Sequence, residues 1–265
     1  PLERPVEIFG APCLELRLSS DKAAGLLAVR LCEVRPDGSS SRVSFAVLNL
    51  CHKDGSESPE PLLPNEEFRI VLKLNFVAYK FNVGNRIRVA LSNNYWPMIW
   101  PSAENSVLSF HSKSFKLTLP LFESKLFREL EDPFERAECA SPAKVTVIEK
   151  DSAERVLSYD VVSRKSSLIH TETSGPKRLD DINLVCKGAV SESFFINDDD
   201  PISAHSIFYR KNVVMRENWS ATTITKLDFS CNKLNFFASI SVEAFEADKK
   251  IFDRVWHEKI PRQNV

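Results

Sequence analysis

The chain has 265 residues, a net charge of −1 and a pI near 6.6, and its 43% hydrophobic and 27% charged residues are ordinary for a globular protein. It has neither the basic surface that suits nucleic acid or an anionic membrane nor an apolar run of the ~20 residues that a bilayer span needs, so we expect neither partner. Only 7 glycines occur and the chain begins at Pro1, which argues against a complete nucleotide-binding or α/β-hydrolase catalytic domain and for a fragment of a longer protein.

Hydrophobic residues alternate with polar ones along residues 1–120, and this period of two predicts short, half-buried β-strands. The segment 45–50 is apolar on both faces, which predicts a central strand covered from two sides. Turn sequences such as Pro36-Asp37-Gly38 separate the runs, as is typical of a β-sandwich. The clearest alternating runs are 14–18, 68–74, 87–91 and 115–119.

The pattern changes at residue 121. Phe122, Leu126 and Leu130 recur every four residues, which predicts a short amphipathic helix that Pro133 ends. We therefore interpret residues 121–142 as a linker with a short helix between two β domains.

Strand patterns return in residues 143–265. The best example is 234–244, and a second alternating run at 251–256 follows a hairpin connection at 247–250. The sequence therefore predicts a second antiparallel β domain over residues 143–265. Weaker strand candidates are 145–149, 156–162, 182–186 and 207–215.

Six cysteines are spread along the chain without a CxxC pair, and most lie in apolar, strand-like runs. A chain of this size does not need disulfides for stability, so we expect reduced cysteines in a cytoplasmic protein.

Motifs for catalysis, cofactors and metals are missing from the sequence. None of the seven glycines begins the GxSxG turn of a serine hydrolase, and a phosphate-binding glycine loop is also missing. The five histidines lie more than five residues apart, without HExxH or zinc-finger spacing. We assign no catalytic, cofactor-binding or metal-binding residue.

The acidic run Asp198-Asp199-Asp200 has two interpretations. Clustered carboxylates can hold calcium, but the ligand spacing of a calcium loop is missing. We therefore favour a solvated turn before a strand.

The most unusual segment is residues 93–101, which places Tyr95, Trp96 and Trp100 beside two prolines directly after a predicted strand. Because proline lacks an N–H, this segment is a rigid loop rather than another strand. Its aromatic rings either cap the sandwich core, lie at a domain interface, or contact a ligand.

Three segments together resemble the C-terminal domain of X-Pro dipeptidyl-peptidases and cocaine-esterase-like hydrolases. They are the opening PLERPVEIFGAPCLELRLSSD, the VxPDG-like turn at 34–38 within LLAVRLCEVRPDGSSSRV, and the FxxGxRIRVxLS-like strand at 81–92. The resemblance covers roughly residues 1–120, and residues after 121 are similar to the tail of a longer subset of these hydrolases.

This resemblance implies an all-β fold, a galactose-binding-like jelly-roll β-sandwich followed by a second antiparallel β unit. It also implies that an α/β-hydrolase domain of the same parent chain carries the Ser, Asp and His of catalysis and packs against the sandwich. Tyr95, Trp96 and Trp100 are then candidates for the domain interface or the substrate pocket.

Three hypotheses remain open from the sequence. The first is a non-catalytic β region that helps shape the substrate pocket or subunit interface of a serine hydrolase of the dipeptidyl-peptidase or acyl esterase type. The second is a carbohydrate-binding jelly-roll module, because exposed aromatic rings can stack on sugars. The third is a structural assembly domain that forms a homo-oligomer.

Overall fold

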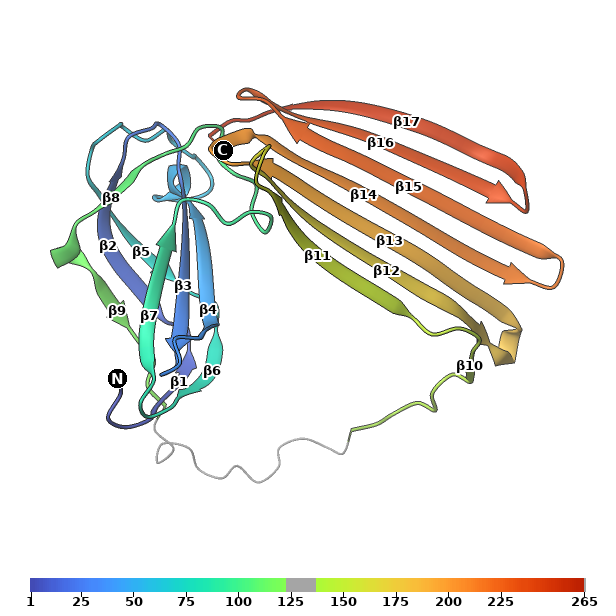
Figure 1. Cartoon of the computed structure of the whole chain (residues 1–265), viewed down its shortest axis with the longest axis horizontal. Coiled ribbons are helices and arrows are strands. Elements are labelled where there is room, and N and C mark those ends of the chain that lie inside the picture. The colour runs from blue at the N-terminus through green and yellow to red at the C-terminus, as the bar shows by residue number, and fades with distance from the viewer. Residues whose placement is uncertain (123–136, 265) are drawn as a thin grey trace. The chain divides into compact units, whose positions relative to one another are not determined.

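A computed structural model describes residues 1–122 and 137–264 (Figure 1). The chain divides into two compact units: unit 1 is Pro1–Arg136 with Asn264–Val265, and unit 2 is Ala137–Gln263. Both are built from antiparallel strands, so the protein is all-β, and unit 1 is a sandwich. The helix predicted around Leu126 lies outside the described residues. No helix in the described ranges is long and apolar enough to cross a bilayer.

Unit 1 contains a two-stranded, a four-stranded and a three-stranded antiparallel sheet. The strand orders are β1-β6, then β5-β2-β8 with β9 also paired to β2, and β4-β3-β7. The strands are β1 (Val6–Gly10), β2 (Cys13–Ser20), β3 (Leu26–Val34), β4 (Ser40–Asn49), β5 (Phe68–Lys73), β6 (Val77–Phe81), β7 (Arg86–Ser92), β8 (Leu108–Phe110) and β9 (Lys116–Thr118), with short 3-10 turns at Leu50–His52 and Ser112–Ser114.

The alternation seen in the sequence forms the core of unit 1. Leu14, Leu16 and Leu18 on β2 all point inward and are at most 1% exposed. Leu27 and Leu31 on β3 are fully buried in the same cluster. Each such leucine stabilises the fold by about 1.5–3 kcal/mol relative to an exposed position, so the predicted strand at 14–18 is confirmed as a core strand.

The prediction of a central strand at 45–50 is wrong. β4 is an edge strand of its sheet, and β3 is the central one. The outward apolar side chains of β4 are only half-buried, and the ring of Phe45 contacts Tyr95 and Arg42 instead of a second layer of strands. The continuous hydrophobicity of residues 45–50 therefore reflects contact with an aromatic side chain of a nearby loop rather than a central position in the sheet.

A buried carboxylate joins the end of β3 to the turn before β7. Glu33 is 2% exposed and accepts hydrogen bonds from the Asn85 amide at 2.8 Å, the Asn82 backbone N–H at 3.0 Å and the Tyr79 hydroxyl at 2.8 Å. The Asn85 and Asn82 bonds lower the pKa of Glu33, while burial raises the pKa of Tyr79. Gly84, with a φ of +82°, makes this turn possible. The turn fixes where β7 starts.

Unit 2 is a single antiparallel sheet of eight strands, in which neighbours along the chain from β11 to β17 lie side by side (Figure 1). The strand order is β10-β12-β13-β14-β15-β16-β17, with β11 also paired to β12. The strands are β10 (Val145–Val147), β11 (Ser152–Asp160), β12 (Lys165–Leu179), β13 (Leu184–Asn197), β14 (Asp200–Arg216), β15 (Trp219–Cys231), β16 (Asn235–Glu246) and β17 (Lys249–Pro261), with a 3-10 turn at Asp180–Ile182.

The two clearest strand predictions in this half are confirmed. The predicted strand at 234–244 is β16, the run at 251–256 lies in β17, and the hairpin between them turns at Ala247 and Asp248. The weaker candidates coincide with parts of β10, β11, β13 and β14. Two long strands, β12 and β15, escaped prediction.

Candidate functional site

The aromatic loop, residues 93–101, leaves the end of β7 on the side of the β4-β3-β7 sheet that faces away from the core. Because side chains alternate along a strand, the inward Val29 and Leu31 of β3 place Arg30 and Cys32 on the opposite, outer face. Arg30 lies level with Phe45 of β4. The outer face of this sheet therefore offers an arginine and an aromatic ring to the loop.

Tyr95 is held against this outer face by three side chains. Its ring meets the Phe45 ring edge-on, with centroids 6.1 Å apart, and the Arg30 guanidinium lies 5.2 Å from the ring centroid. Arg42 donates a hydrogen bond to its hydroxyl, and Arg30 in turn donates one to Ser92 Oγ at 3.2 Å. Tyr95 therefore fixes the aromatic loop to the sheet.

Trp96 and Trp100 pair with each other at the far side of the loop. Their rings are edge-to-face with centroids 5.0 Å apart, and the Trp96–Pro97 peptide bond is cis. The Trp96 N–H donates to Asn94 Oδ1 at 3.0 Å, and the Ile99 N–H donates to the Tyr95 carbonyl at 3.0 Å. Both indole rings are half-buried, so the loop presents a fixed aromatic surface.

The structure brings the three predicted site residues, Tyr95, Trp96 and Trp100, into one loop. Tyr95 anchors it to the sheet and the two tryptophans form its other side. Whether this surface meets another domain stays a prediction.

The outer face around Tyr95 is basic. Arg42 and Arg88 are exposed and flank Cys32 in neighbouring strands, with Arg30 two residues along β3. The Nε atom of Arg30 is buried, and within the described part of the chain it has no hydrogen-bond partner. Guanidinium groups beside aromatic rings suit a surface that carries carboxylates and apolar side chains.

Sequence reasoning named the aromatic residues of this candidate site but not its arginines. Arg30 and Arg42 lie 65 and 53 positions before Tyr95 in the chain, so spacing could not connect them. The only available signal was Arg30, a charged residue in the middle of the mostly apolar run Leu26–Val34, which also contains Glu33.

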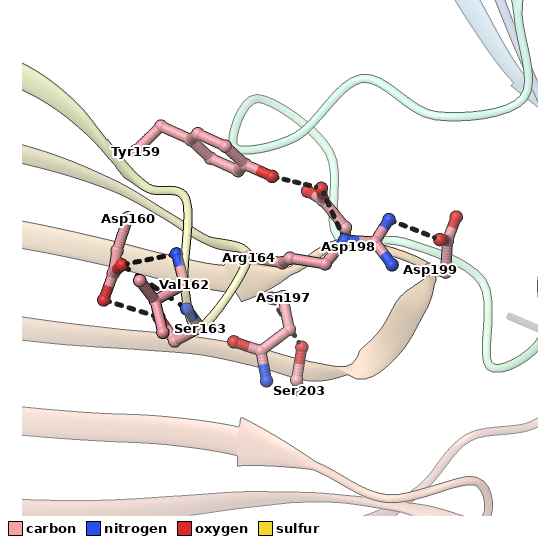
Figure 2. Close-up of polar contacts among 9 residues, drawn as sticks. All are labelled: Tyr159, Asp160, Val162, Ser163, Arg164, Asn197, Asp198, Asp199 and Ser203. Atoms are coloured by element: carbon pink, nitrogen blue, oxygen red, sulfur yellow. Dashed lines mark hydrogen bonds and ion pairs between the residues drawn. The ribbon is translucent and has the colours of Figure 1, made fainter.

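In the acidic run at the turn between β13 and β14, two of the three carboxylates are paired with an arginine. Arg164 lies beside Asp198 and Asp199 (Figure 2). The nitrogen–oxygen distances are 3.5 Å and 2.9 Å, and the Tyr159 hydroxyl donates a hydrogen bond to Asp198 at 2.7 Å. The Asp199 hydrogen bond raises the pKa of Arg164. Among the described residues, no group of three or more His, Cys, Asp or Glu side chains is arranged to hold a metal. These contacts join the turn between β11 and β12 to the turn between β13 and β14.

Two histidines of unit 2 have carboxylate neighbours. His170 lies 3.2 Å from Glu172 and 3.6 Å from Glu192, and His205 lies 3.1 Å from Asp228. No serine hydroxyl is hydrogen-bonded to a histidine ring in residues 1–122 and 137–264, so these pairs do not form a serine nucleophile site there.

One face of the sheet in unit 2, the apolar sheet face, is lined with large hydrophobic side chains. Phe208 lies opposite Leu227, and Leu227 lies opposite Ile240. The rings of Phe194 and Phe208 meet edge-on with centroids 5.5 Å apart. Unit 2 has no second layer within its described residues, and Leu157 at one side of this face is 77% exposed. Such a face is typical of a surface that another molecule covers.

Comparison with known proteins places the first half of the chain in a described family. The family described as the X-Pro dipeptidyl-peptidase C-terminal non-catalytic domain matches residues 1–140. These residues include all of the strands of unit 1 and the aromatic loop.

Two curated relatives and two solved structures resemble parts of the chain. Proteins of Mycobacterium bovis and Mycobacterium tuberculosis named as serine esterases are each 28% identical over 109 residues, which is 35% of this chain and 17% of theirs. An alpha-amino acid ester hydrolase (19% identity) and an aminopeptidase from a marine-sediment Thaumarchaeota archaeon (16% identity) each match 46% of this chain, with TM-scores of 0.44. The match covers 24% and 25% of those two chains. The chain thus spans about a sixth of the curated relatives' length.

Proposed function

Because this chain belongs to the family of X-Pro dipeptidyl-peptidase C-terminal non-catalytic domains, we propose that it is the non-catalytic β region of a serine hydrolase that cleaves peptides or esters. Membership of this family implies a catalytic domain in the parent chain. In finer detail, the proposal includes a galactose-binding-like jelly roll for unit 1, a cocaine-esterase-like parent enzyme and a cytoplasmic location. The serine esterase names of the two mycobacterial relatives support the reaction class.

The aromatic loop and the basic outer face form the surface that packs on the α/β-hydrolase domain and helps shape its pocket. The observation that carries this step is the fixation of Tyr95 by Arg42, Arg30 and Phe45, which holds the loop rigid before any partner binds. A rigid surface loses little conformational entropy on association. Tryptophan and arginine are also the residues that most often dominate binding energy at interfaces.

The first test is an assay of the isolated chain. It should fold, with the circular dichroism of an all-β protein, and hydrolyse neither X-Pro anilides nor short acyl esters. Turnover that a serine-reactive phosphonate abolishes would contradict the proposal.

The second test substitutes the loop in the full-length parent enzyme. Trp100→Ala should lower kcat/KM by about tenfold, since truncating a central interface residue costs at least ~1–2 kcal/mol. Phe110→Ala is the matched control, because that ring is 42% exposed in β8, which belongs to the other sheet. Equal activity of Trp100→Ala and wild type would remove the loop from the interface.

A carbohydrate-binding module is the competing function, and the two tryptophans are the observation in its favour. They form an edge-to-face pair, which leaves parts of both rings available for a sugar. The half-exposed Met98 between them suits a protein surface better than a polar sugar. Glycan-array binding that Trp96→Ala abolishes would favour this alternative.

We also propose that a second copy of the chain covers the apolar sheet face, giving a homo-oligomer. Phe194, Phe208 and Leu227 on this face are only half-buried, and Leu157 is 77% exposed. The face therefore retains apolar area that a second copy can bury. Two such sheet faces pack well at about 10 Å with nearly aligned strands.

Light scattering of the isolated chain tests this step. A dimer that Phe194→Asp dissociates, and that Ile169→Asp on the opposite face of the same sheet leaves intact, supports it. A strictly monomeric wild-type chain would contradict self-association and leave the catalytic domain as the partner that covers this face.

A further inference from the structure

In unit 2, residues 148–151 connect β10 to β11 along one edge of β12 and fold against its Gly175, and we call this segment the strap. The pairing of β12 with β13 shifts register between Ser174 and Lys177, which is a β-bulge. The strap lies against this bulge, because the N–H groups of Ile148 and Glu149 both donate to the Pro176 carbonyl, at 2.9 Å and 3.3 Å. The bulge therefore holds a second piece of backbone above the sheet.

Asp151 fastens the strap from its other end. Its carboxylate accepts hydrogen bonds from the Gly175 N–H at 3.1 Å and from Lys177 Nζ at 2.6 Å. A Cβ atom at Gly175 would lie 2.4 Å from the Glu149 carbonyl oxygen, so only glycine lets the strap backbone approach β12 this closely. The strap is thus a built feature of the sheet rather than a loose connection.

A hollow of about 400 Å³ lies between this strap and strands β12, β13 and β14. Small residues form its base: Thr173 and Ala189 are neighbours across β12 and β13, and Gly188 precedes Ala189 on β13. Val213, which is 8% exposed, adds an apolar wall. The short side chains at the base leave the space above them open.

Three lysines line this hollow. Lys150 comes from the strap, Lys187 from β13 and Lys211 from β14. Within the described part of the chain none of the three forms an ion pair, and the one carboxylate among the lining residues is Glu149. The neighbouring Asp151 is already occupied by Lys177. Like charges that converge on one hollow repel each other, and an anion bound between them offsets this repulsion.

We propose that this lysine hollow binds a small organic anion with two or more negative charges, such as a phosphate ester or a polycarboxylate. Three ammonium groups supply the charge and up to three donors each, and Ser152 and Thr173 add hydroxyls from the lining. The apolar base accommodates the carbon skeleton of the ligand. This site is independent of the interface proposed for unit 1.

The test uses the whole chain and two probes, pyrophosphate and citrate. Each probe at about 10 mM should raise the midpoint of unit 2's thermal unfolding by several degrees, because a ligand that binds only the folded state stabilises it. The double variant Lys187→Gln/Lys211→Gln should raise the dissociation constant by about tenfold or more, since the bound polyanion loses two nearby positive charges. The matched control is Lys226→Gln, an exposed lysine on β15 that does not line the hollow.

Each outcome either supports or overturns anion binding in the lysine hollow. Binding in wild type and control, with loss in the double variant, supports it, and the stronger of the two probes assigns phosphate or carboxylate chemistry. No saturable binding of either probe overturns it. Equal weakening by Lys226→Gln also overturns it, because binding would then reflect general charge. Gly175→Ala gives a second readout: it should loosen the strap and weaken binding while β14–β17 stay folded.

Discussion

The two units of this chain are made from the same kind of strand but bury it very differently. In unit 1, leucines such as Leu14 and Leu27 are fully buried between facing sheets. In unit 2, the strands are longer, yet Ala204 and Val213 are the only hydrophobic residues buried in its described part. The first unit finds its hydrophobic partner within its own chain, whereas the second presents one whole face outward.

The difference shows the limit of alternating hydrophobicity as a structural signal. A hydrophobic period of two predicts which side chains share a face of a sheet, but it does not predict what covers that face. A single sheet with an open apolar face is rarely stable alone, because burial supplies most of the favourable free energy. We therefore expect unit 1 to fold independently and unit 2 to depend on contact with another surface.

The largest effect should come from removing matched leucines from the two units. Leu16→Ala should lower the free energy of unfolding of unit 1 by about 3–5 kcal/mol, since it opens a cavity in a packed core. Leu157→Ala, at a side chain that is 77% exposed, should change that of unit 2 by less than about 1 kcal/mol. Urea unfolding followed by circular dichroism measures both, and similar costs in the two units would abolish the contrast.

A second effect should come from the buried carboxylate of unit 1. The pKa of Glu33 is lower in the folded chain than its ordinary value of 4.5, so the ionised carboxylate stabilises the fold. That stabilisation is complete above pH 4.5 and is lost as the pH falls through the folded-state pKa. The free energy of unfolding of unit 1 should therefore fall as the pH drops below 4.5.

The variant Glu33→Gln isolates this effect. It keeps the shape but replaces an acceptor by a donor among the donors from Asn85, Asn82 and Tyr79, which should cost about 1–3 kcal/mol at neutral pH. It should also flatten the acid dependence of unit 1's unfolding midpoint below pH 4.5, where the lowered pKa of Glu33 places its protonation in the folded chain. An unchanged acid profile in the variant would mean that other carboxylates are responsible.

The smallest effect should come from Tyr95→Phe. The change removes the hydroxyl that accepts from Arg42 but keeps the ring contacts with Phe45 and Arg30. We expect a loss of about 1 kcal/mol or less, because Arg42 is exposed and returns to water. A change in the fluorescence of Trp96 and Trp100 without a change in the unfolding midpoint would show that the hydroxyl positions the loop.

The strands that the sequence could predict are those with large aliphatic side chains at alternate positions. β2, β7 and β16 follow directly from such alternation. β12 and β15 were missed because their alternating residues are largely serine and threonine, and β12 also contains Gly175 and Pro176. Threonine fits a strand as a β-branched residue, but its polarity hides the period of two.

The candidate sites were predictable only in part. The density of aromatic residues at 93–101 indicated a special loop, but its attachment through Arg42 depends on a fold that brings distant residues together. The lysine hollow gave no sequence signal at all. Lys150, Lys187 and Lys211 lie far apart in the chain, and only the pairing of β10 and β11 with β12, and of β12, β13 and β14 with each other, gathers them.

The meander of unit 2 has a consequence for the order in which the chain folds. From β12 to β17, each strand pairs with the one before it, so the sheet can grow hairpin by hairpin through local contacts. Unit 1 also needs a distant pairing, which brings Val6 to Phe81. Folding rates fall as contacts become more distant in sequence. The less buried half of the chain is therefore the half whose backbone pairing forms faster.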